Sequence, residues 1–515
     1  MTDTLLPPAR GLPPHLRRLF AGLILSMILA SLDQSIVNTA LPRMAGDLGG
    51  LAHLSWVVTA FMLASTSATP IFGKLSDMFG RRAFLIGAIS LFLVMSMLCG
   101  LAQSMPQLIA FRFLQGVGAG GIMTLTQTVI SDVVTPRERV RYQGFFSAAF
   151  AFSSLAGPLL GGGLTTALSW RWVFYINLPI GLLALALLWR ALPPPPPRKP
   201  HRIDYEGAAL LVTGASSLLL LFSLGGSLFA WGSVASFALG GLGLLAIALF
   251  LWVETRAREP VITLPLFRIG AFSTGVLTMA CMGFAMMSAM VFLPLYFQLV
   301  LGLNPAQAGA MMLPQILAMV LTSIFGGRLS ARLGRPKVFM VTGVGLEALG
   351  LGTLAVLATY AAPVPAFWGA LAMLGFGMGI AMPNATAIVQ NAVPKASIGS
   401  ATATMSFLRS LGGASGVAVS GGVMAQGLSQ GLRHLGGDVD IGAIVNGGME
   451  AVAQLPAAMR PEIEAAFRHA ITGSFEIGGA VMSVAFIVAL TLRNTGFAPA
   501  DMPHEGRKPA TDRNV

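Results

Sequence analysis

The stretch GKLSDMFGRR (residues 73–82) is a short charged segment between two long apolar runs, and GRLSARLGRPK (residues 327–337) repeats it in the second half of the chain. The apolar runs before and after each copy are about 20 residues long, enough for a helix to cross a bilayer. A loop repeated at the same place between two such runs indicates duplication of a larger unit. The repeat therefore predicts two halves of similar architecture.

The composition places the chain in a membrane. Of its 515 residues, 55% are hydrophobic and 10% are charged, and its mean hydropathy is +0.76, whereas soluble domains carry about 25% charged residues. The runs are too long for barrel strands, and backbone groups in lipid must be hydrogen-bonded within their own segment, so we predict an all-α membrane protein. The first run lacks a small-residue cleavage site, which indicates a retained helix rather than a signal peptide.

Fourteen apolar runs are present, which predicts fourteen transmembrane helices. Their approximate cores are residues 19–41, 54–72, 84–103, 106–130, 143–167, 172–191, 207–226, 235–253, 271–298, 308–327, 338–360, 365–390, 398–425 and 471–492. The copies of the charged loop follow the second and tenth runs, so the predicted layout is six helices, two inserted helices and six helices.

This layout divides the chain into segments. In order we expect a tail (1–18), a six-helix half (19–191), a proline-rich basic linker (192–206), two inserted helices (207–253), a loop (254–270), a second six-helix half (271–492) with an outward loop (426–470), and a tail (493–515). In the outward loop, PEIEAAFRHA (461–470) predicts a short amphipathic helix with proline at its first position. We expect it to cap the bundle, and a docking surface for a partner is the alternative.

The charges predict the topology and exclude one class of partner. The net charge is +12, but 25 of the 32 Lys and Arg residues fall in tails and loops on one side of the predicted helices and five in loops on the other. By the positive-inside rule both termini are cytoplasmic, and the even number of helices agrees. Basic residues distributed in this way do not indicate a nucleic-acid-binding protein. Cys99 and Cys281 lie in apolar runs and all six histidines lie in loops or tails, so we expect no metal site and no redox chemistry.

Asp33 is an acid inside the first apolar run, about 12 Å below its outer end. A carboxylate facing lipid would cost at least about 2.5 to 3.5 kcal/mol, so this side chain must face protein or a water-filled cavity. Burial and a nearby cation shift the pKa of a carboxylate in opposite directions, so a buried acid can be tuned to load and release a proton. We interpret Asp33 as a proton-coupling residue; a permanently hydrogen-bonded structural aspartate is the alternative.

Arg112 lies at the same depth in the fourth run, within LIAFRFLQGVGAGG (108–121), about 9 Å from the outer end. A buried guanidinium needs a partner, so we assign Arg112 to proton coupling together with Asp33. Polar neighbours on these two helices, Gln34, Asn38 and Gln115, are candidate lining residues of a substrate cavity.

Two acids lie in apolar runs of the second half. Glu347 is near the midplane and could bind a cationic substrate, form a second proton site or pair with Arg409 at similar depth, and we favour the ion pair. Glu476, nearer the outer boundary, is expected to line the exit. Met286 and Met290 could furnish an adaptable apolar cavity, although ordinary core or lipid-facing positions are the alternative.

The fifth run carries small residues at fixed spacing. They are Gly144, Ser153, Gly157 and Pro158, followed by Gly161 and Gly162 within GPLLGG (157–162). Proline removes one backbone hydrogen bond and small residues permit close approach of a second helix, so we predict a bend and a tight helix contact.

Taken in order, these motifs resemble those of the major facilitator superfamily, specifically its fourteen-helix drug:proton antiporter branch of the EmrB/QacA type. The matching positions are Gly73, Leu75, Asp77, Gly80, Arg81 and Arg82 in the first charged loop, Arg112, Gln115, Gly116 and Gly118 in the fourth helix, Gly144 and Gly157–Gly162 in the fifth, and Leu32, Asp33, Ala40, Leu41 and Pro42 in the first. WRWVFYINLPIG (170–181) is also similar to that branch.

The resemblance implies a conformational latch on the cytoplasmic side, made of Asp77 and the neighbouring arginines with their flanking glycines. The alternative is that these arginines only enforce topology. Three positions depart from the pattern: Ser153 replaces a glycine, Met78 replaces a basic residue, and Ala331 stands where the second loop would carry an aspartate. We therefore expect only the first copy to supply an ionic latch.

The implied function is proton-coupled antiport, exporting hydrophobic, cationic or neutral small molecules across the inner membrane by alternating access. The resemblance implies a transporter and not an enzyme, with no cofactor and with the proton gradient as its energy source. The sequence contains no G-x-x-x-x-G-K-[ST] loop that would bind ATP. The expected partners are small-molecule substrates and the lipid bilayer, and a periplasmic adaptor protein stays open. The alternatives are proton symport or uniport of a small metabolite, or a membrane sensor without transport.

Overall fold

The computed structural model describes residues 14–48, 54–192, 203–225, 229–431 and 460–492. Within these residues the chain forms helices joined by short turns, and the only extended pairing is an isolated bridge between Gly225 and Phe229. The predicted all-α fold class is confirmed.

The first half contains seven helical segments, of which the short α6 continues almost directly into α7. They are α1 (Pro14–Leu48), α2 (Leu54–Phe79), α3 (Arg81–Leu101), α4 (Met105–Val133), α5 (Pro136–Ala167), α6 (Trp172–Tyr175) and α7 (Asn177–Ala191). The inserted pair is α8 (Tyr205–Leu224) and α9 (Val234–Glu254).

The second half begins after a short 3-10 turn. Its elements are η2 (Leu264–Arg268), α10 (Gly270–Leu299), α11 (Pro305–Met311), α12 (Leu313–Leu333), α13 (Pro336–Thr359), α14 (Val364–Asn391), η3 (Lys395–Ser397), α15 (Ile398–Gly431) and α17 (Arg460–Leu490).

Thirteen helical stretches among the described residues are long and apolar enough to cross a membrane, with α6 and α7 forming one stretch and α11 and α12 another. The remaining long helix, α15, has 34 residues, many of them Gly, Ser, Thr and Ala, and it is not among these thirteen stretches. It packs against α10 and α17 in its own half and against α2 in the other. With α15 counted, the described helices match the fourteen predicted spans.

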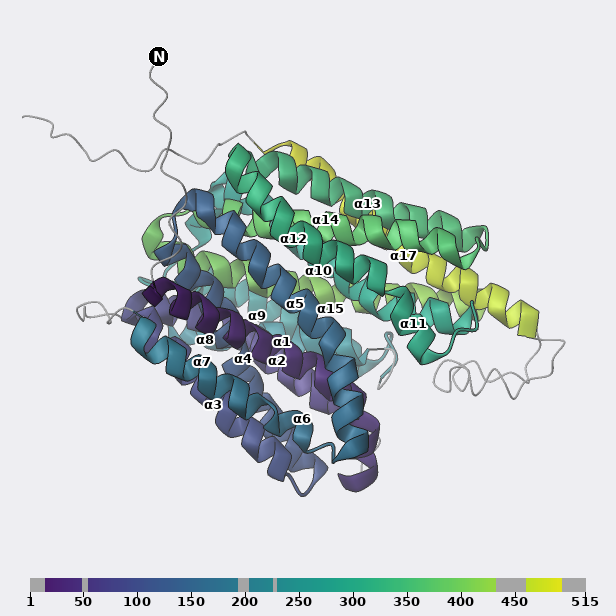
Figure 1. The fold of residues 1–515 in the computed structure, drawn as a ribbon, viewed down its shortest axis with the longest axis horizontal. Helices are drawn as coiled ribbons and strands as arrows, with labels where there is room; N and C mark the ends of the chain where they lie inside the picture. The colour runs from purple at the N-terminus through teal and green to yellow at the C-terminus, as the bar shows by residue number, and fades with distance from the viewer. Residues whose placement is uncertain (1–13, 49–53, 193–202, 226–228, 432–459, 493–515) are drawn as a thin grey trace, which may run out of the picture.

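The two halves lie side by side, the first in purple to blue and the second in green to yellow (Figure 1). Each has its own apolar core, because every helix turns one face toward its neighbours within the half. The halves meet along two seams, one where α5 packs against α12 and α14 and one where α2 packs against α15. The inserted helix α8 contacts both α2 and α15, so it covers the second seam.

One end of the bundle carries both copies of the charged loop, 73–82 and 327–337, and we call it the latch end. The last helix finishes there, because Lys337 Nζ donates to the carbonyl of Leu490 at 3.2 Å. The first helix starts there too, where the ring of Phe20 stacks on Tyr142 of α5 at 4.1 Å. The described ends of α1 and α17 therefore lie on one side, and the cytoplasmic location of that side stays a prediction.

The outward loop differs from the expected boundaries 426–470. Helix α15 continues to Gly431, and the stretch 461–470, expected as a separate short helix, forms the first turns of α17. Its apolar residues Ile463, Phe467 and Ala470 are buried in the core of the second half and continue the inward face of the helix below. No helix-breaking residue separates the two, so the amphipathic stretch and the final span form one helix.

The segment that connects the inserted pair to the second half is held by a buried acid. Glu254, at the end of α9, accepts hydrogen bonds from the backbone N–H of Val261 at 3.0 Å and Ile262 at 3.2 Å. The hydroxyl of Ser400, near the start of α15, donates to the carbonyl of Val261 at 3.1 Å. The inserted pair is thereby fastened to the seam between the halves at the latch end.

Candidate functional site: a buried ion pair and a central cavity

Asp33 of α1 and Arg112 of α4 form an ion pair inside the first half. A guanidinium N–H of Arg112 donates to Asp33 Oδ2 at 2.6 Å, and the two side chains are 1% and 0% exposed. Gln115 Nε2 donates to Asp33 Oδ1 at 2.9 Å, and Asn177 Nδ2, from α7, donates to the same oxygen at 2.7 Å. One carboxylate thus connects three helices, with its charge balanced by the guanidinium.

A second layer of contacts fixes these side chains. Asn177 also donates to Ser96 Oγ of α3 at 2.9 Å, and that hydroxyl donates to the carbonyl of Phe174 at 2.9 Å. The guanidinium of Arg112 lies over the ring of Phe61, 4.0 Å from its centroid. The network therefore includes residues of α1, α2, α3, α4, α6 and α7.

Asp33 and Arg112 were predicted from the sequence as one site, whereas Gln115 was expected in the substrate cavity and the partners Asn177 and Ser96 were missed. Asn177 lies within the INLPIG stretch that looked typical of the family, and it is a polar residue in an otherwise apolar run. That polarity was the available signal. The spacing within one helix could not show that its side chain reaches α1.

A cavity of about 380 Å³ lies between the two halves and the inserted helix α8. The first half contributes Ser31, Gln34, Ser35, Asn38, Val58, Met62, Phe150 and Ser154, α8 contributes Phe222 and Ser223, and the second half contributes Met287, Met290, Val291, Gly413, Ala414 and Val417. None of these lining residues is charged. The cavity combines hydroxyl and amide groups on one wall with thioether and aliphatic groups on the other, which suits a hydrophobic ligand with few polar atoms.

The candidate cavity residues fall into three groups. Gln34, Asn38 and Met290 line the central cavity, as expected. Gln115 belongs to the Asp33 network instead, and Met286 packs against the core of the second half. The contribution of α8 was not expected, because nothing in the sequence ties the inserted pair to the cavity.

The favoured ion pair between Glu347 and Arg409 is wrong, because no contact joins them among the described residues. Glu347 is 1% exposed between α13 and α14, near Gly377, and both of its carboxylate oxygens lack a hydrogen-bond partner. Arg409 lies on α15, against Gly283 of α10. Similar depth in the membrane does not imply that two side chains face each other. Neither residue lines the central cavity.

The small residues of α5 serve two contacts. A Cβ on Gly144 would overlap the carbonyl oxygen of Ser323 on α12, so this glycine permits close contact across the seam between the halves. Gly157 and Gly161 play the same part toward Ser35 and Thr39 of α1.

Three further positions complete the fifth-helix motif. Ser153 Oγ accepts a hydrogen bond from Ser31 Oγ at 3.0 Å. The serine that replaces the glycine of the motif therefore forms a hydrogen bond to α1. Pro158 is exposed, and Gly162 has open space where a side chain would project. The motif therefore joins α5 mainly to α1 and, through Gly144 alone, to the second half.

Asp77 connects the two halves at the latch end. Its carboxylate accepts hydrogen bonds from the backbone N–H of Gly399 at 3.1 Å and of Ser400 at 2.7 Å, at the start of α15. It is also paired with Arg81, whose Nε donates to Asp132 at 2.9 Å. A negative charge at a helix N-terminus is stabilised by the unpaired N–H groups and the helix dipole.

The other predicted latch residues have separate positions. Gly73 lies against the backbone of Gly399 and the side chain of Ala403, with no room for a Cβ, and Gly80 has a φ of 95°, a left-handed conformation that favours glycine. Arg82 donates to the carbonyl of Trp189 at 2.8 Å, within its own half.

The second copy of the loop is bound through its backbone. Arg137 of α5 donates to the carbonyls of Ala331 at 2.6 Å and Arg332 at 2.5 Å, at the end of α12. A cation at a helix C-terminus complements the acid at the N-terminus of α15. Arg139 adds hydrogen bonds to Asn391 Oδ1 at 2.6 Å and the carbonyl of Gln390 at 3.1 Å. The latch end is therefore closed along both seams.

Two bundles of helices with a cavity between them, in contact at one end through two copies of a repeated loop, are typical of transporters built from internal repeats. Comparison with known proteins agrees. The family model described as Major Facilitator Superfamily matches residues 23–417. The chain belongs to the major facilitator superfamily, and it is a multi-pass membrane transporter and not an enzyme.

Its similar relatives include bacterial proteins. It is 38% identical over 407 residues to the multidrug transporter protein MdtP of Bacillus subtilis, covering 79% of this chain and 75% of the relative. It is 34% identical over 404 residues to multidrug resistance protein 3 of the same organism, covering 78% of each. Among solved structures, the proton:xylose symporter XylE is similar in fold, with a TM-score of 0.61 and 15% identity over 92% of this chain and 94% of that one.

Proposed function

We propose that this chain is a proton-coupled antiporter that exports hydrophobic small molecules, neutral or weakly cationic. The observation that supports the proposal most is the buried ion pair of Asp33 and Arg112. A carboxylate that is sequestered from both lipid and solvent can bind and release a proton when its surroundings change. The names of the relatives MdtP and multidrug resistance protein 3 support export of drugs.

Protonation of Asp33 would remove the negative charge that balances Arg112. The guanidinium would then be buried without a counter-charge, and α1, α4 and α7 would lose the contact that joins them. Another packing of these helices would become favourable, which couples a proton to a change of conformation. Asp33 itself does not line the central cavity, so coupling to the substrate acts through α1, whose Gln34 and Asn38 do.

The closed latch end supports an outward-facing assignment for this conformation, with the central cavity accessible from the opposite end. In the inward-facing conformation the contacts of Asp77 and Arg137 would be broken. With about 100 mV and a pH gradient, one proton supplies on the order of a few kcal/mol per cycle.

The substrate class follows from the cavity wall. Because no charged side chain lines it, binding relies on apolar contact with residues such as Met287, Met290 and Phe222, and on hydrogen bonds from Gln34 and Asn38. Flexible methionine side chains adapt to different shapes, which favours a broad range of substrates.

The test is exchange in proteoliposomes with an imposed pH gradient, using ethidium and a neutral hydrophobic dye. We expect wild-type protein to move dye against the direction of proton flow. Asp33→Asn should lower gradient-driven exchange at least tenfold, because coupling requires an ionisable group at this position. Groups positioned for proton transfer contribute on the order of 10²-fold or more to a rate.

The matched control is Asp47→Asn, on the same helix, where the acid accepts a hydrogen bond from Trp170 Nε1 at 2.7 Å outside the ion-pair network. This variant should retain exchange. Normal gradient-driven exchange by Asp33→Asn would remove Asp33 from the mechanism, and dye movement in the same direction as protons would indicate symport.

A further inference from the structure

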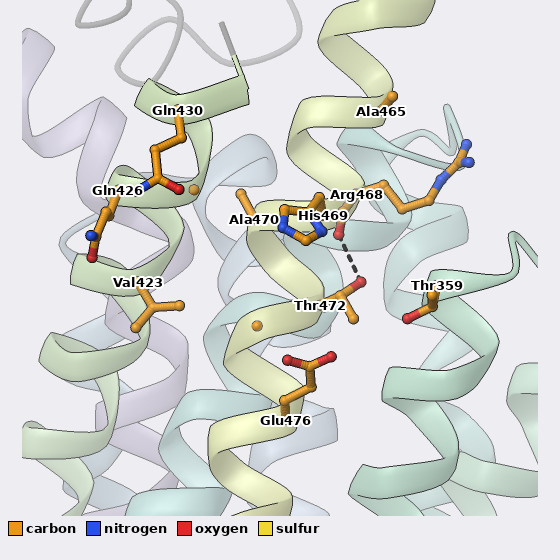
Figure 2. A pocket seen from close by; sticks show the side chains of 12 residues that line it. Thr359, Val423, Gln426, Gln430, Ala465, Arg468, His469, Ala470, Thr472 and Glu476 are labelled. Atoms are coloured by element: carbon orange, nitrogen blue, oxygen red, sulfur yellow. Dashed lines mark hydrogen bonds between the residues drawn. The ribbon is translucent and has the colours of Figure 1, made fainter. Parts of the chain in front are cut away.

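A groove lies on the surface of the second half, toward the end opposite the latch end, where α13, α15 and α17 enclose about 600 Å³. Figure 2 shows Thr472 and Glu476 of α17 between Gln426 and Val423 of α15 on one side and Thr359 of α13 on the other. His469 lies two helical turns above Glu476 on the same face. This upper chamber is lined largely by polar side chains.

A second chamber of about 500 Å³ adjoins the first, and the two share Thr359 and Glu476. Apart from the two shared residues its lining is largely apolar, and most of the side chains are small: Ala348, Gly352, Ala355, Val356, Tyr360, Gly479, Ala480 and Ser483. From Thr359 to Ala348 it follows α13 for about 16 Å, half the thickness of the hydrocarbon layer. Glu476 therefore stands at the junction of a polar and an apolar chamber.

Among the residues that the structure describes, none forms an ion pair with the carboxylate of Glu476. Glu476 lies within the candidate span Glu462–Thr491, and its side chain is exposed. Arg468 also lines the upper chamber, about two helical turns above Glu476, and in Figure 2 its guanidinium extends away from the Glu476 carboxylate. An acid on the lipid-facing part of a helix is unfavourable unless a cation or a polar partner meets it.

We propose that this groove binds a lipophilic organic cation that enters from the surrounding lipid. Its positive charge lies beside Glu476 and its apolar body occupies the lower chamber. Each chamber has the volume of a pocket for a drug-sized molecule. The groove shares no lining residue with the central cavity, so it is a second site that goes beyond the proposed export function.

A zwitterionic phospholipid fits the groove less well. Its phosphate would need a basic partner close to the ammonium group beside Glu476. The basic residues of the groove, His469 and Arg468, lie about 10 to 12 Å from Glu476 along the helix axis. The single unpaired carboxylate matches a ligand with one positive charge and no negative one.

The test uses purified protein in phosphatidylglycerol nanodiscs, labelled with a hydrophobic carbodiimide that modifies membrane-embedded carboxyl groups. Mass spectrometry of the peptide that contains Glu476 measures the modified fraction. We expect tetraphenylphosphonium to lower this fraction at least fivefold, and neutral triphenylphosphine oxide to leave it unchanged. Equal protection by the neutral compound would overturn the assignment of a cation.

Two variants make the test specific. Glu476→Gln should lose one class of tetraphenylphosphonium sites in equilibrium dialysis, whereas Glu464→Gln, which removes an exposed acid on the same helix outside the groove, should keep it. Unchanged binding by Glu476→Gln would overturn the proposal. So would protection of Glu476 by phosphatidylethanolamine nanodiscs alone, because the occupant would then be a lipid.

The proposal is separable from proton-coupled export. Asp33→Asn should keep the protection of Glu476 by tetraphenylphosphonium in full, because the two residues lie in different halves. Loss of that protection in Asp33→Asn would contradict an independent site, whereas loss of transport alone would concern only the export mechanism.

Discussion

At the scale of single residues, breaking the ion pair of Asp33 and Arg112 costs free energy, and removal of either charge destabilises the protein. Both side chains are almost fully buried, and each has further hydrogen bonds that keep its geometry. In such a pair, removal of one partner leaves an uncompensated buried charge, at a cost of about 3 to 5 kcal/mol, whereas removal of both charges is less harmful.

We therefore predict that Arg112→Gln lowers stability by about 3 to 5 kcal/mol, and that Asp33→Asn combined with Arg112→Gln recovers most of the loss. Thermal unfolding of purified protein in detergent, followed by apparent Tm, measures both. Equal losses that add in the double variant would show that the two side chains do not interact energetically.

The sequence predicted side-chain partners correctly where depth along the helix was sufficient to identify them. The depth of Asp33 and of Arg112 along their helices follows from counting residues, and equal depth on helices that pack together gave the correct pair. The same reasoning failed for Glu347 and Arg409, because α13 and α15 turn these side chains toward different neighbours. Rotation about a helix axis is set by tertiary packing, and runs that are apolar on all sides do not reveal it.

At the scale of elements, helix termini join the halves. Asp77 binds the start of α15 and Arg137 binds the end of α12, so each seam carries a charge placed against an opposite helix pole. The absence of an acid at Ala331 correctly indicated that the second loop lacks a carboxylate latch. The hydrogen bonds that Arg137 donates to the backbone carbonyls of this loop could not be predicted. Every peptide unit has a carbonyl, and only the fold determines which of them a side chain reaches.

The inserted helix α8 also lines the central cavity. Phe222 of α8 lines the space between the halves, and α8 covers the seam between α2 and α15. A large apolar side chain contributes about 1.5 to 3 kcal/mol when fully buried against a ligand, which corresponds to tenfold or more in affinity.

We predict that Phe222→Ala raises KM for bulky apolar dyes about tenfold and changes the rank order of substrates, with little change for small ones. Dye efflux measured over a concentration series in a host lacking other pumps gives these values. Phe237→Ala, on the lipid-exposed side of α9, is the matched control and should transport normally. A uniform loss across all dyes in Phe222→Ala would assign this residue to folding rather than to specificity.

At the scale of the whole molecule, closure of the latch end is an equilibrium between two arrangements of the halves. The charged carboxylate of Asp77 accepts two hydrogen bonds from backbone N–H groups of α15, each worth about 1.5 to 3 kcal/mol. Only part of this hydrogen-bond free energy favours the closed arrangement, because in the open arrangement water solvates the carboxylate of Asp77 and the backbone N–H groups of α15.

We predict that Asp77→Asn increases the ratio of open to closed latch end about tenfold or more. Spin labels on the exposed positions Ala83 and Arg335, one in each half, report the separation by pulsed double resonance, with Cys281 replaced by Ala and Cys99 left buried. Asp132→Asn removes an acid whose ion pair is with Arg81 of its own half and not with α15, and it should keep the closed distance. Identical distance distributions in all three proteins would contradict a latch at Asp77.

The composition of α15 has a consequence for synthesis of the protein. This helix supplies the N–H groups that bind Asp77 and packs against both halves, and its Gly, Ser and Thr content makes those contacts possible. The same residues leave it outside the thirteen stretches that are long and apolar enough to cross a membrane, so it partitions into lipid poorly by itself. We therefore expect α15 to be integrated stably only together with its packing partners α10 and α17, so the seam with α2 would form late in synthesis.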